Sequence, residues 1–270
     1  DRVQVASLCK WSLNFLSILF ISKKETVVSF PTYSSYEELL NAIDAGGTGR
    51  EILNPATGEV VGQADTATVD DLNDAVVQAR EAYETFKKTS HDERCALLME
   101  AADAIKANAE PLAELLSREQ GKPLNGPNAR FEIGGAEAWT RATASFPLDP
   151  EVIVDDGETY STLTYRPLGV VGAIGPWNWP VMITVWQLAP ALRMGNTVVV
   201  KPSEHTPLSV KALVHLFQAV FPEGTVKYVS GDRGLGAALS KHEDVDKIMF
   251  TGSTATGAKI IEASAPTQKR

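Results

Sequence analysis

Four short apolar runs between Gly169 and Gly257 limit the folds that this chain can adopt. Small or polar residues follow each run, and helix-length segments separate the runs. Continuous apolar runs of this length, alternating with helices, are typical of a parallel sheet that is covered on both faces. The sequence therefore predicts an α/β fold with flanking helices over residues 167–270. The predicted strands are Val170–Gly175, Thr197–Val200, Thr225–Val229 and Asp246–Phe250.

Composition and charge exclude several classes of function. The chain has 270 residues, of which 44% are apolar and 22% charged, as in an ordinary globular protein. Its formal net charge of −9 argues against nucleic acid as a partner. The two cysteines, Cys9 and Cys95, lie far apart, and neither they nor the four histidines have metal-ligand spacing. We therefore expect no metal site, and a reducing, cytoplasmic location.

Residues 1–50 differ from the rest of the chain in their pattern of apolar and charged residues. The apolar run Trp11–Ile21 has 11 residues, whereas a helix needs about 20 to span a bilayer. The residues around Lys23 are a poor cleavage site for a signal peptide. A leader outside the core is favoured over a packed peripheral element and over a targeting or membrane segment. With Gly46–Gly49 as a linker, residues 1–50 are predicted to be leader and linker.

Residues 51–150 are predicted to form a mainly helical region. It opens with Asn54–Gly62, which is typical of a turn between two short strands. Thr68 can cap one helix, and Ser90 with Glu93 makes a capping box for the next. Apolar residues then recur at helical spacing. The predicted helices span residues 68–87, 92–107, 110–120 and 131–146.

Residues 151–166 change to the period of a β-hairpin. Val152–Val154 and Thr159–Tyr165 are β-prone, and a turn at Asp155–Gly157 separates them. Such an arm needs a partner surface, either in the same chain or in another subunit. We predict that it is an oligomerisation arm.

Glycines and a serine follow the last two predicted strands. Thr251, Gly252 and Ser253 lie between a strand and a helix, where free backbone N–H groups would bind a phosphate. A simple helix cap would look the same. Gly231 and Gly236 belong to a G-x-x-G-x-G pattern that is not the usual dinucleotide fingerprint, although it permits a tight turn.

The loops after the first two strands carry polar side chains that have two interpretations each. Lys201 and Glu204 could bind an adenosine ribose, or could form an exposed ion pair. Asn178 lies in a turn bracketed by Pro176 and Pro180. A rigid turn can aim its side-chain amide at a developing alkoxide, but an asparagine that only stabilises its own turn is the alternative.

Taken together, these motifs resemble the NAD(P)-dependent aldehyde dehydrogenase superfamily over about residues 51–263, with a Rossmann-like sheet. Six blocks occur in the family's order and spacing: Asn54–Glu59, Tyr165–Val171, Pro176–Pro180, Leu188–Leu192, Gly195–Glu204 and Phe250–Ser253.

The resemblance implies a role for each of these site residues. It assigns the ribose to Lys201 and Glu204, and the oxyanion to Asn178. It implies NAD as the cofactor, with NADP as the alternative. The other cofactor-binding residues that it implies are Ile174, Pro176, Trp177, Ser203, Gly231, Gly236, Phe250, Thr251, Gly252 and Ser253.

One departure from the family pattern has a functional consequence. The family's nucleophilic cysteine and its general-base glutamate, in a Glu-Leu-Gly-Gly block, are absent, and neither Cys9 nor Cys95 aligns with the nucleophile. We expect an amino-terminal part of an aldehyde dehydrogenase that largely lacks the catalytic domain and is inactive alone. The complete enzyme is expected to be a homo-oligomer that oxidises a small-molecule aldehyde, without membrane or nucleic acid. A non-catalytic nucleotide-binding or subunit-pairing module is the alternative.

Overall fold

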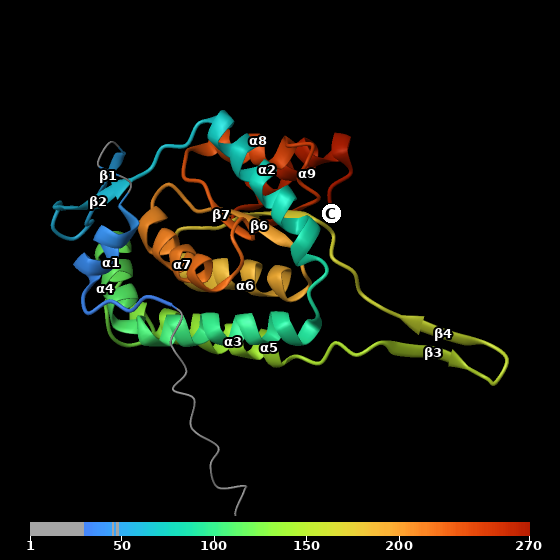
Figure 1. Cartoon of the computed structure of the whole chain (residues 1–270). Helices are drawn as coiled ribbons and strands as arrows, with labels where there is room; N and C mark the ends of the chain where they lie inside the picture. The colour runs from blue at the N-terminus through green and yellow to red at the C-terminus, as the bar shows by residue number, and fades with distance from the viewer. Residues whose placement is uncertain (1–29, 45, 47–48) are drawn as a thin grey trace, which may run out of the picture.

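The computed structural model describes residues 30–270 apart from 45, 47 and 48 (Figure 1). The expectations for Trp11–Ile21 and for the centre of the linker lie outside the described residues. The prediction of a leader outside the core is wrong for residues 36–43, which form a helix whose Leu39 and Ile43 are buried in the core because its apolar residues share one face. The helices are α1 Tyr36–Ile43, α2 Val69–Phe86, α3 His91–Ala107, α4 Ala109–Gln120, α5 Ala129–Ser145, α6 Pro180–Arg193, α7 Pro207–Val220, α8 Arg233–Lys241 and α9 Thr254–Ser264. The strands are β1 Arg50–Leu53, β2 Val60–Ala64, β3 Glu151–Asp155, β4 Tyr160–Leu163, β5 Val170–Ile174, β6 Thr197–Lys201, β7 Val226–Tyr228 and β8 Lys247–Phe250.

The predicted parallel sheet is confirmed, and its strand order is β7-β6-β5-β8. Strands β5 to β7 run outward in chain order, and β8 then returns to the other side of β5. Ile174 at the end of β5 pairs with Lys201 on one side and with Phe250 on the other. The order therefore reverses beside β5, and ligands of open α/β sheets bind at the carboxyl ends next to such a reversal.

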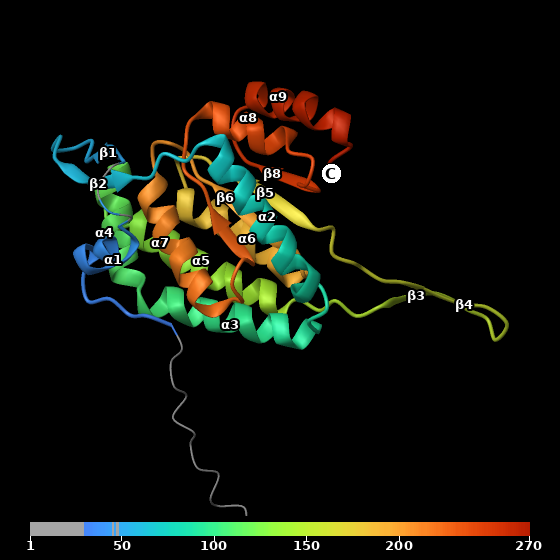
Figure 2. The ribbon, with the colours of Figure 1, turned by 45° about the horizontal axis from the view of Figure 1, so that its top comes forward.

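Helices cover both faces of this sheet, which explains its apolar strands (Figure 2). Val170 and Ile174 pack in one buried cluster with residues of α2 and α8. Val171 and Ala173, which alternate with them, pack in the other with residues of α6 and α7. Helices α3, α4 and α5 form a further layer against α6 and α7 (Figure 1). Helices α6 and α7 thus lie between the sheet and helices α3 to α5, whereas α2 packs directly on the opposite face of the sheet.

The predicted helix caps are confirmed. Thr68 with Asp71, and Ser90 with Glu93, form capping boxes at the starts of α2 and α3. Helix α4 ends at Gly121, whose φ of 81° is the left-handed conformation that glycine adopts without strain. Helices α6 and α7 have a proline in the first turn and no local side-chain cap, so their first N–H groups need partners from elsewhere.

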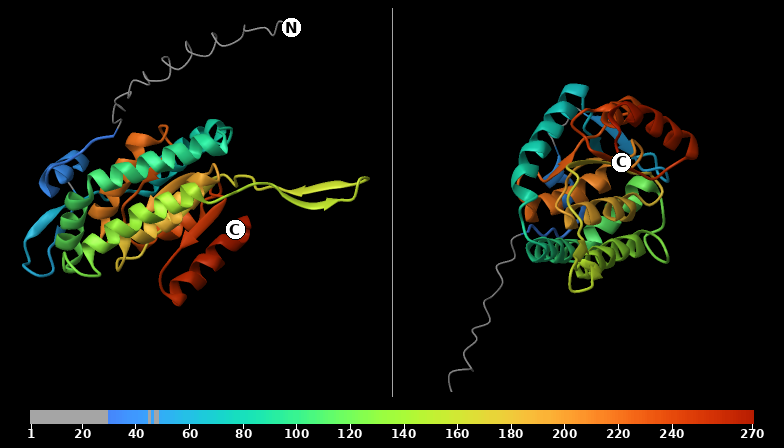
Figure 3. Two further views of the ribbon diagram at one scale, coloured as in Figure 1. Left: turned by 90° about the horizontal axis from the view of Figure 1, so that it is seen from below. Right: turned by 90° about the vertical axis from the view of Figure 1, so that its right-hand side faces the viewer.

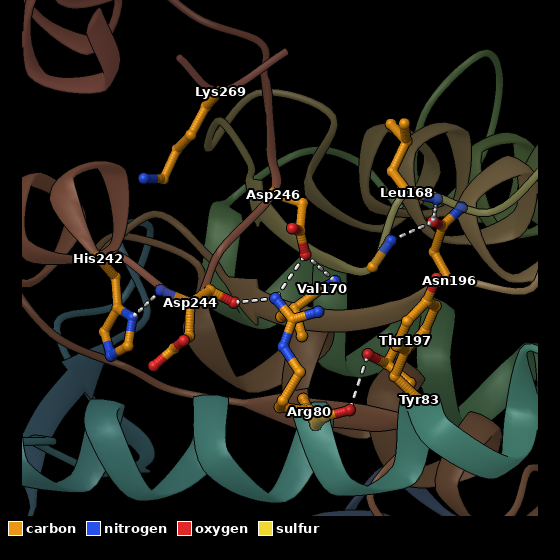
Figure 4. Close-up of polar contacts among 12 residues, drawn as sticks. Arg80, Tyr83, Leu168, Val170, Asn196, Thr197, His242, Asp244, Asp246 and Lys269 are labelled. Atoms are coloured by element: carbon orange, nitrogen blue, oxygen red, sulfur yellow. Dashed lines mark hydrogen bonds and ion pairs between the residues drawn. The ribbon is translucent and has the colours of Figure 1, made fainter. Parts of the chain in front are cut away.

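Polar contacts hold the amino ends of the strands together (Figure 4). Arg80 of α2 donates to the carboxylate of Asp246 at 2.6 Å, and the N–H of Val170 donates to the same oxygen at 2.8 Å. The side-chain oxygen of Asn196 accepts from the N–H of Gly169 at 3.1 Å. These groups are therefore used by the fold itself.

The predicted hairpin is confirmed as β3 paired antiparallel with β4. It projects away from the rest of the chain (Figure 3), and every residue of both strands is exposed. Among the described helices, none has the length and apolar character needed to cross a membrane.

Candidate functional site

A cavity of about 630 Å³ lies at the carboxyl ends of β5 and β6, against α8 and α9. It contains four of the residues predicted to bind the cofactor: Ile174, Lys201, Gly236 and Ser253. The remaining lining residues are Arg233, Gly234, Ala237, Ser240, Ala255, Thr256, Lys259, Ile260 and Ala263. The cavity therefore combines small side chains with three cations, an environment that suits an anionic nucleotide.

Lys201 is the buried cation of this cavity. It is 6% exposed, and its Nζ donates to the carbonyl of Pro202 at 2.9 Å. Burial lowers the pKa of Lys201, and the nearby carboxylates of Glu204 and Asp232 partly oppose this effect. Among the described residues, no ion pair joins Lys201 to Glu204 and no carbonyl other than that of Pro202 accepts from its ammonium group. N–H donors of Lys201 thus remain for a ligand.

Hydrogen bonds to backbone groups hold the loop that follows β6. The guanidinium of Arg50 in β1 donates to the carbonyl of Glu204, and Ser203 Oγ accepts from the N–H of His205 at 3.3 Å. The carboxylate of Glu204, which is half-buried, accepts no hydrogen bond from the described residues. This loop therefore presents an unused carboxylate beside Lys201.

The start of α9 supplies backbone donors. Ser253 is its N-cap, and the Oγ atom accepts from the N–H of Thr256 at 3.2 Å. The N–H groups of Thr254 and Ala255 have no acceptor among the described residues, so they are available to an anion. At Gly252, a Cβ would approach the ring of Phe250 to 2.5 Å, so a larger residue here would have to displace that ring. Capping and phosphate binding are thus compatible at Ser253.

Asn178 lies in the turn between β5 and α6. Its backbone carbonyl accepts from Lys122 Nζ at 2.8 Å and from Gln120 Nε2 at 3.3 Å. Its exposed side-chain amide makes no hydrogen bond to the described residues, so an asparagine that stabilises its own turn finds no support here. The amide is free to donate to a substrate.

Comparison with known proteins decides the family. The model of the aldehyde dehydrogenase family matches residues 43–270. The chain belongs to the aldehyde dehydrogenase family. It is 42% identical over 218 residues to aldehyde dehydrogenase LUC3 of Fusarium sp, covering 81% of this chain and 46% of LUC3.

Solved structures agree with this membership. The PnpE structure in complex with nicotinamide adenine dinucleotide has a TM-score of 0.78 and 38% identity, over 83% of this chain and 47% of PnpE. The NAD⁺ complex of the Bacillus cereus aldehyde dehydrogenase has a TM-score of 0.77 and 35% identity, with the same two coverages. The chain thus spans about half the length of the relatives that it matches.

The other predicted residues of this aldehyde dehydrogenase chain lie outside the cavity lining. Thr251, directly after β8, donates from its N–H to the carbonyl of Ile174 at 3.3 Å and so ties β8 to β5. A Cβ at Gly231 would approach Leu235 to 2.7 Å, so the entry to α8 is closely packed. The rest lie in the loops after β5, β6 and β8, or at the end of β8: Pro176, Trp177, Ser203, Glu204, Phe250 and Gly252.

Two buried carboxylates beside these loops were missed by the sequence reasoning. Glu132 of α5 accepts from the N–H groups of Val181 and Met182 at the start of α6. Glu119 of α4 accepts in the same way at the start of α7, from Leu208 at 2.6 Å. Burial raises the pKa of Glu119 to about 7 and also raises the pKa of Glu132.

The distance along the chain explains why these carboxylates were missed. The N–H group of Val181 lies 49 residues after Glu132, and that of Leu208 lies 89 residues after Glu119, so no local motif joins the partners. Arg233 and Lys259 of the cavity were also missed. In the sequence, each of these cations lies among small residues on a predicted helix, and this pattern could have indicated them.

Proposed function

We propose that this chain is the cofactor-binding portion of an NAD-dependent aldehyde dehydrogenase, whose complete reaction oxidises an aldehyde to a carboxylic acid. The single observation that carries the proposal is the cavity beside the strand-order reversal, with buried Lys201 on one side and the unpaired N–H groups of α9 on the other. Its volume and its cationic lining fit a dinucleotide that carries phosphates. Relatives solved with NAD support the same cofactor.

In this proposal each strand end holds one part of the cofactor. Lys201 and Glu204 bind the adenosine ribose with help from the loop at Ser203, and Gly252 with Ser253 contacts the pyrophosphate. NAD supplies the hydride acceptor when bound. The other residues proposed to line the cofactor site are Ile174, Pro176, Trp177, Gly231, Gly236, Phe250 and Thr251.

Asn178 is proposed as the donor to the oxyanion of the reacting aldehyde. Its free amide and its fixed backbone are the features that such a donor needs. We infer from the family pattern that the nucleophile and the general base have no counterpart in this chain. Among the described residues the one free cysteine, Cys95, lies on α3. We therefore expect the chain alone to bind the cofactor without oxidising aldehydes.

Glu204 is proposed to select NAD over NADP. A carboxylate accepts from both ribose hydroxyls of NAD, whereas the 2′-phosphate of NADP would meet it as a like charge. We expect NAD to bind about tenfold or more tightly than NADP, a factor that needs about 1.4 kcal/mol. Calorimetric titration of the chain with each nucleotide measures this ratio. Glu204→Gln should reduce it towards one, while Glu223→Gln, an exposed carboxylate beyond α7, should leave it unchanged.

Two outcomes would contradict this proposal. Equal or tighter binding of NADP would remove Glu204 as the selecting residue. Absence of binding by either nucleotide, in a chain that unfolds cooperatively, would remove the cofactor site itself.

A subunit-pairing role is the second candidate, and the hairpin arm favours it. Its strands expose large apolar side chains, including Ile153 at 55% and Tyr160 at 69%. A homo-oligomer would cover them. A cytoplasmic location is proposed as well, on the basis of the sparse cysteines and the unpaired thiol of Cys95.

A further inference from the structure

Lys122 and Glu132 form a buried ion pair beside the turn that carries Asn178. The two side chains are 10% and 0% exposed, and Lys122 Nζ lies 2.6 Å from Glu132 Oε2. A buried charge that loses its partner is strongly destabilising, so the two groups depend on each other. Each of them also contacts the backbone at or beside the turn.

Glu132 completes the hydrogen bonding at the start of α6. Pro180 has no N–H, and the N–H of Ile183 bonds back to the residue before the helix. This leaves the N–H groups of Val181 and Met182, which donate to Glu132 Oε1 at 2.8 and 3.1 Å. The carboxylate from α5 therefore replaces the missing local cap and fixes the position of the helix start.

Lys122 holds the turn itself. Its Nζ donates to the backbone carbonyl of Asn178 at 2.8 Å and lies 4.3 Å from the centroid of the Trp179 ring. Gln120 adds a second donor to the same carbonyl. These contacts restrain the peptide bond between Asn178 and Trp179, through the carbonyl of the first residue and the ring of the second. The side-chain amide of Asn178 makes no hydrogen bond to the described residues.

We propose that Lys122, neutralised by Glu132, is the positioning residue that aims the amide of Asn178. This inference rests on the proposed role of Asn178 as oxyanion donor. Such a donor contributes most when it is already oriented before the charge develops. The ammonium group orients it by fixing the peptide that follows, and Glu132 places the opposite charge 2.6 Å from that ammonium group in a buried position.

The test separates positioning from folding with two variants of the full chain. Lys122→Met leaves Glu132 buried without a cation, so it should lower stability as well as loosen the turn. Lys122→Met combined with Glu132→Gln leaves a neutral side chain whose oxygen still accepts from α6. The double variant should therefore regain the unfolding midpoint, yet still lack the donor to Asn178.

The readout is ¹⁵N relaxation of the backbone and side-chain amides of Asn178, without cofactor or aldehyde. We expect the order parameter of the Asn178 backbone N–H to fall from about 0.85, typical of rigid backbone, to below about 0.6 in both variants. Arg118→Met is the matched control, because Arg118 also pairs with a glutamate at 2.7 Å and lies 4.2 Å from an aromatic ring, that of Tyr36. It should leave the turn rigid.

A double variant that is stable and keeps a rigid Asn178 overturns the proposal. One that does not regain stability assigns the pair to folding, and overturns it as well. Because no ligand is present, an error in the oxyanion role of Asn178 would leave this result unchanged, and nucleotide titration reports on the cofactor site separately.

Discussion

Glu119 of α4 lies at the start of α7 and forms no ion pair with the part of the chain that the structure describes. It is 3% exposed and accepts from the N–H groups of Leu208 and Ser209, and from the hydroxyl of Ser209 at 2.6 Å. Burial outweighs these donors and raises its pKa from 4.5 to about 7. Between these values the folded chain holds a proton that the unfolded chain releases. Stability should therefore fall as the pH rises from about 4.5 through about 7.

The prediction is tested by urea unfolding of the chain and of Glu119→Gln between pH 5 and pH 8. The free energy of unfolding of the chain, relative to the variant, should decrease by up to about 3 kcal/mol over this interval. Glu114→Gln changes a half-buried carboxylate of the same helix, one that is paired with Arg118, and is the control. A constant difference between the chain and Glu119→Gln would contradict the assignment.

Residues with a local signature were found from the sequence, whereas residues with distant partners were not. Ser253 was recognised because a strand, a glycine and a helix adjoin it. No such local pattern identifies Glu119, Lys122 or Glu132, since a buried charged residue cannot be told from an exposed one by its sequence neighbours. The cofactor roles given to the loop residues remain predictions.

A substitution at the start of α9 can show whether Ser253 is only a helix cap or also a phosphate contact. Ser253→Asp keeps a good N-cap and should change the free energy of unfolding by less than about 0.5 kcal/mol. The added charge would repel a pyrophosphate, so NAD affinity should fall by about tenfold or more.

Titration with NAD and chemical unfolding of the same preparation measure both effects. Ser90→Asp adds a charge at the cap of α3, beside Glu93, and should leave the NAD affinity unchanged. If Ser253→Asp bound NAD like the original chain, Ser253 would be a cap alone.

The architecture was predictable because its elements are defined locally. Apolar runs marked β5 to β8, and capping boxes marked the starts of α2 and α3. Strand order was not predictable, because the return of β8 to the side of β5 depends on contacts between distant segments. The same holds for the capping of α6 by α5, which only tertiary packing creates.

At the scale of the whole molecule, the hairpin arm is the feature without an internal partner. Ile153 and Tyr160 are 55% and 69% exposed on strands β3 and β4, and the arm extends away from the sheet and its helices (Figure 3). If a second copy covers this arm, burying these side chains contributes roughly 1.5–3 kcal/mol each. Ile153→Lys with Tyr160→Lys should then weaken association.

Sedimentation velocity at micromolar concentration measures this association. The original chain should sediment as a dimer or a larger species, and the double variant as a monomer with the same cooperative unfolding. Val77→Lys, which changes a side chain 49% exposed on α2, should sediment like the original chain. The contacts of β3 and β4 are made with each other, so the lysines should leave the fold intact. An original chain that is already monomeric, or a double variant that associates equally well, would show that the arm does not pair subunits.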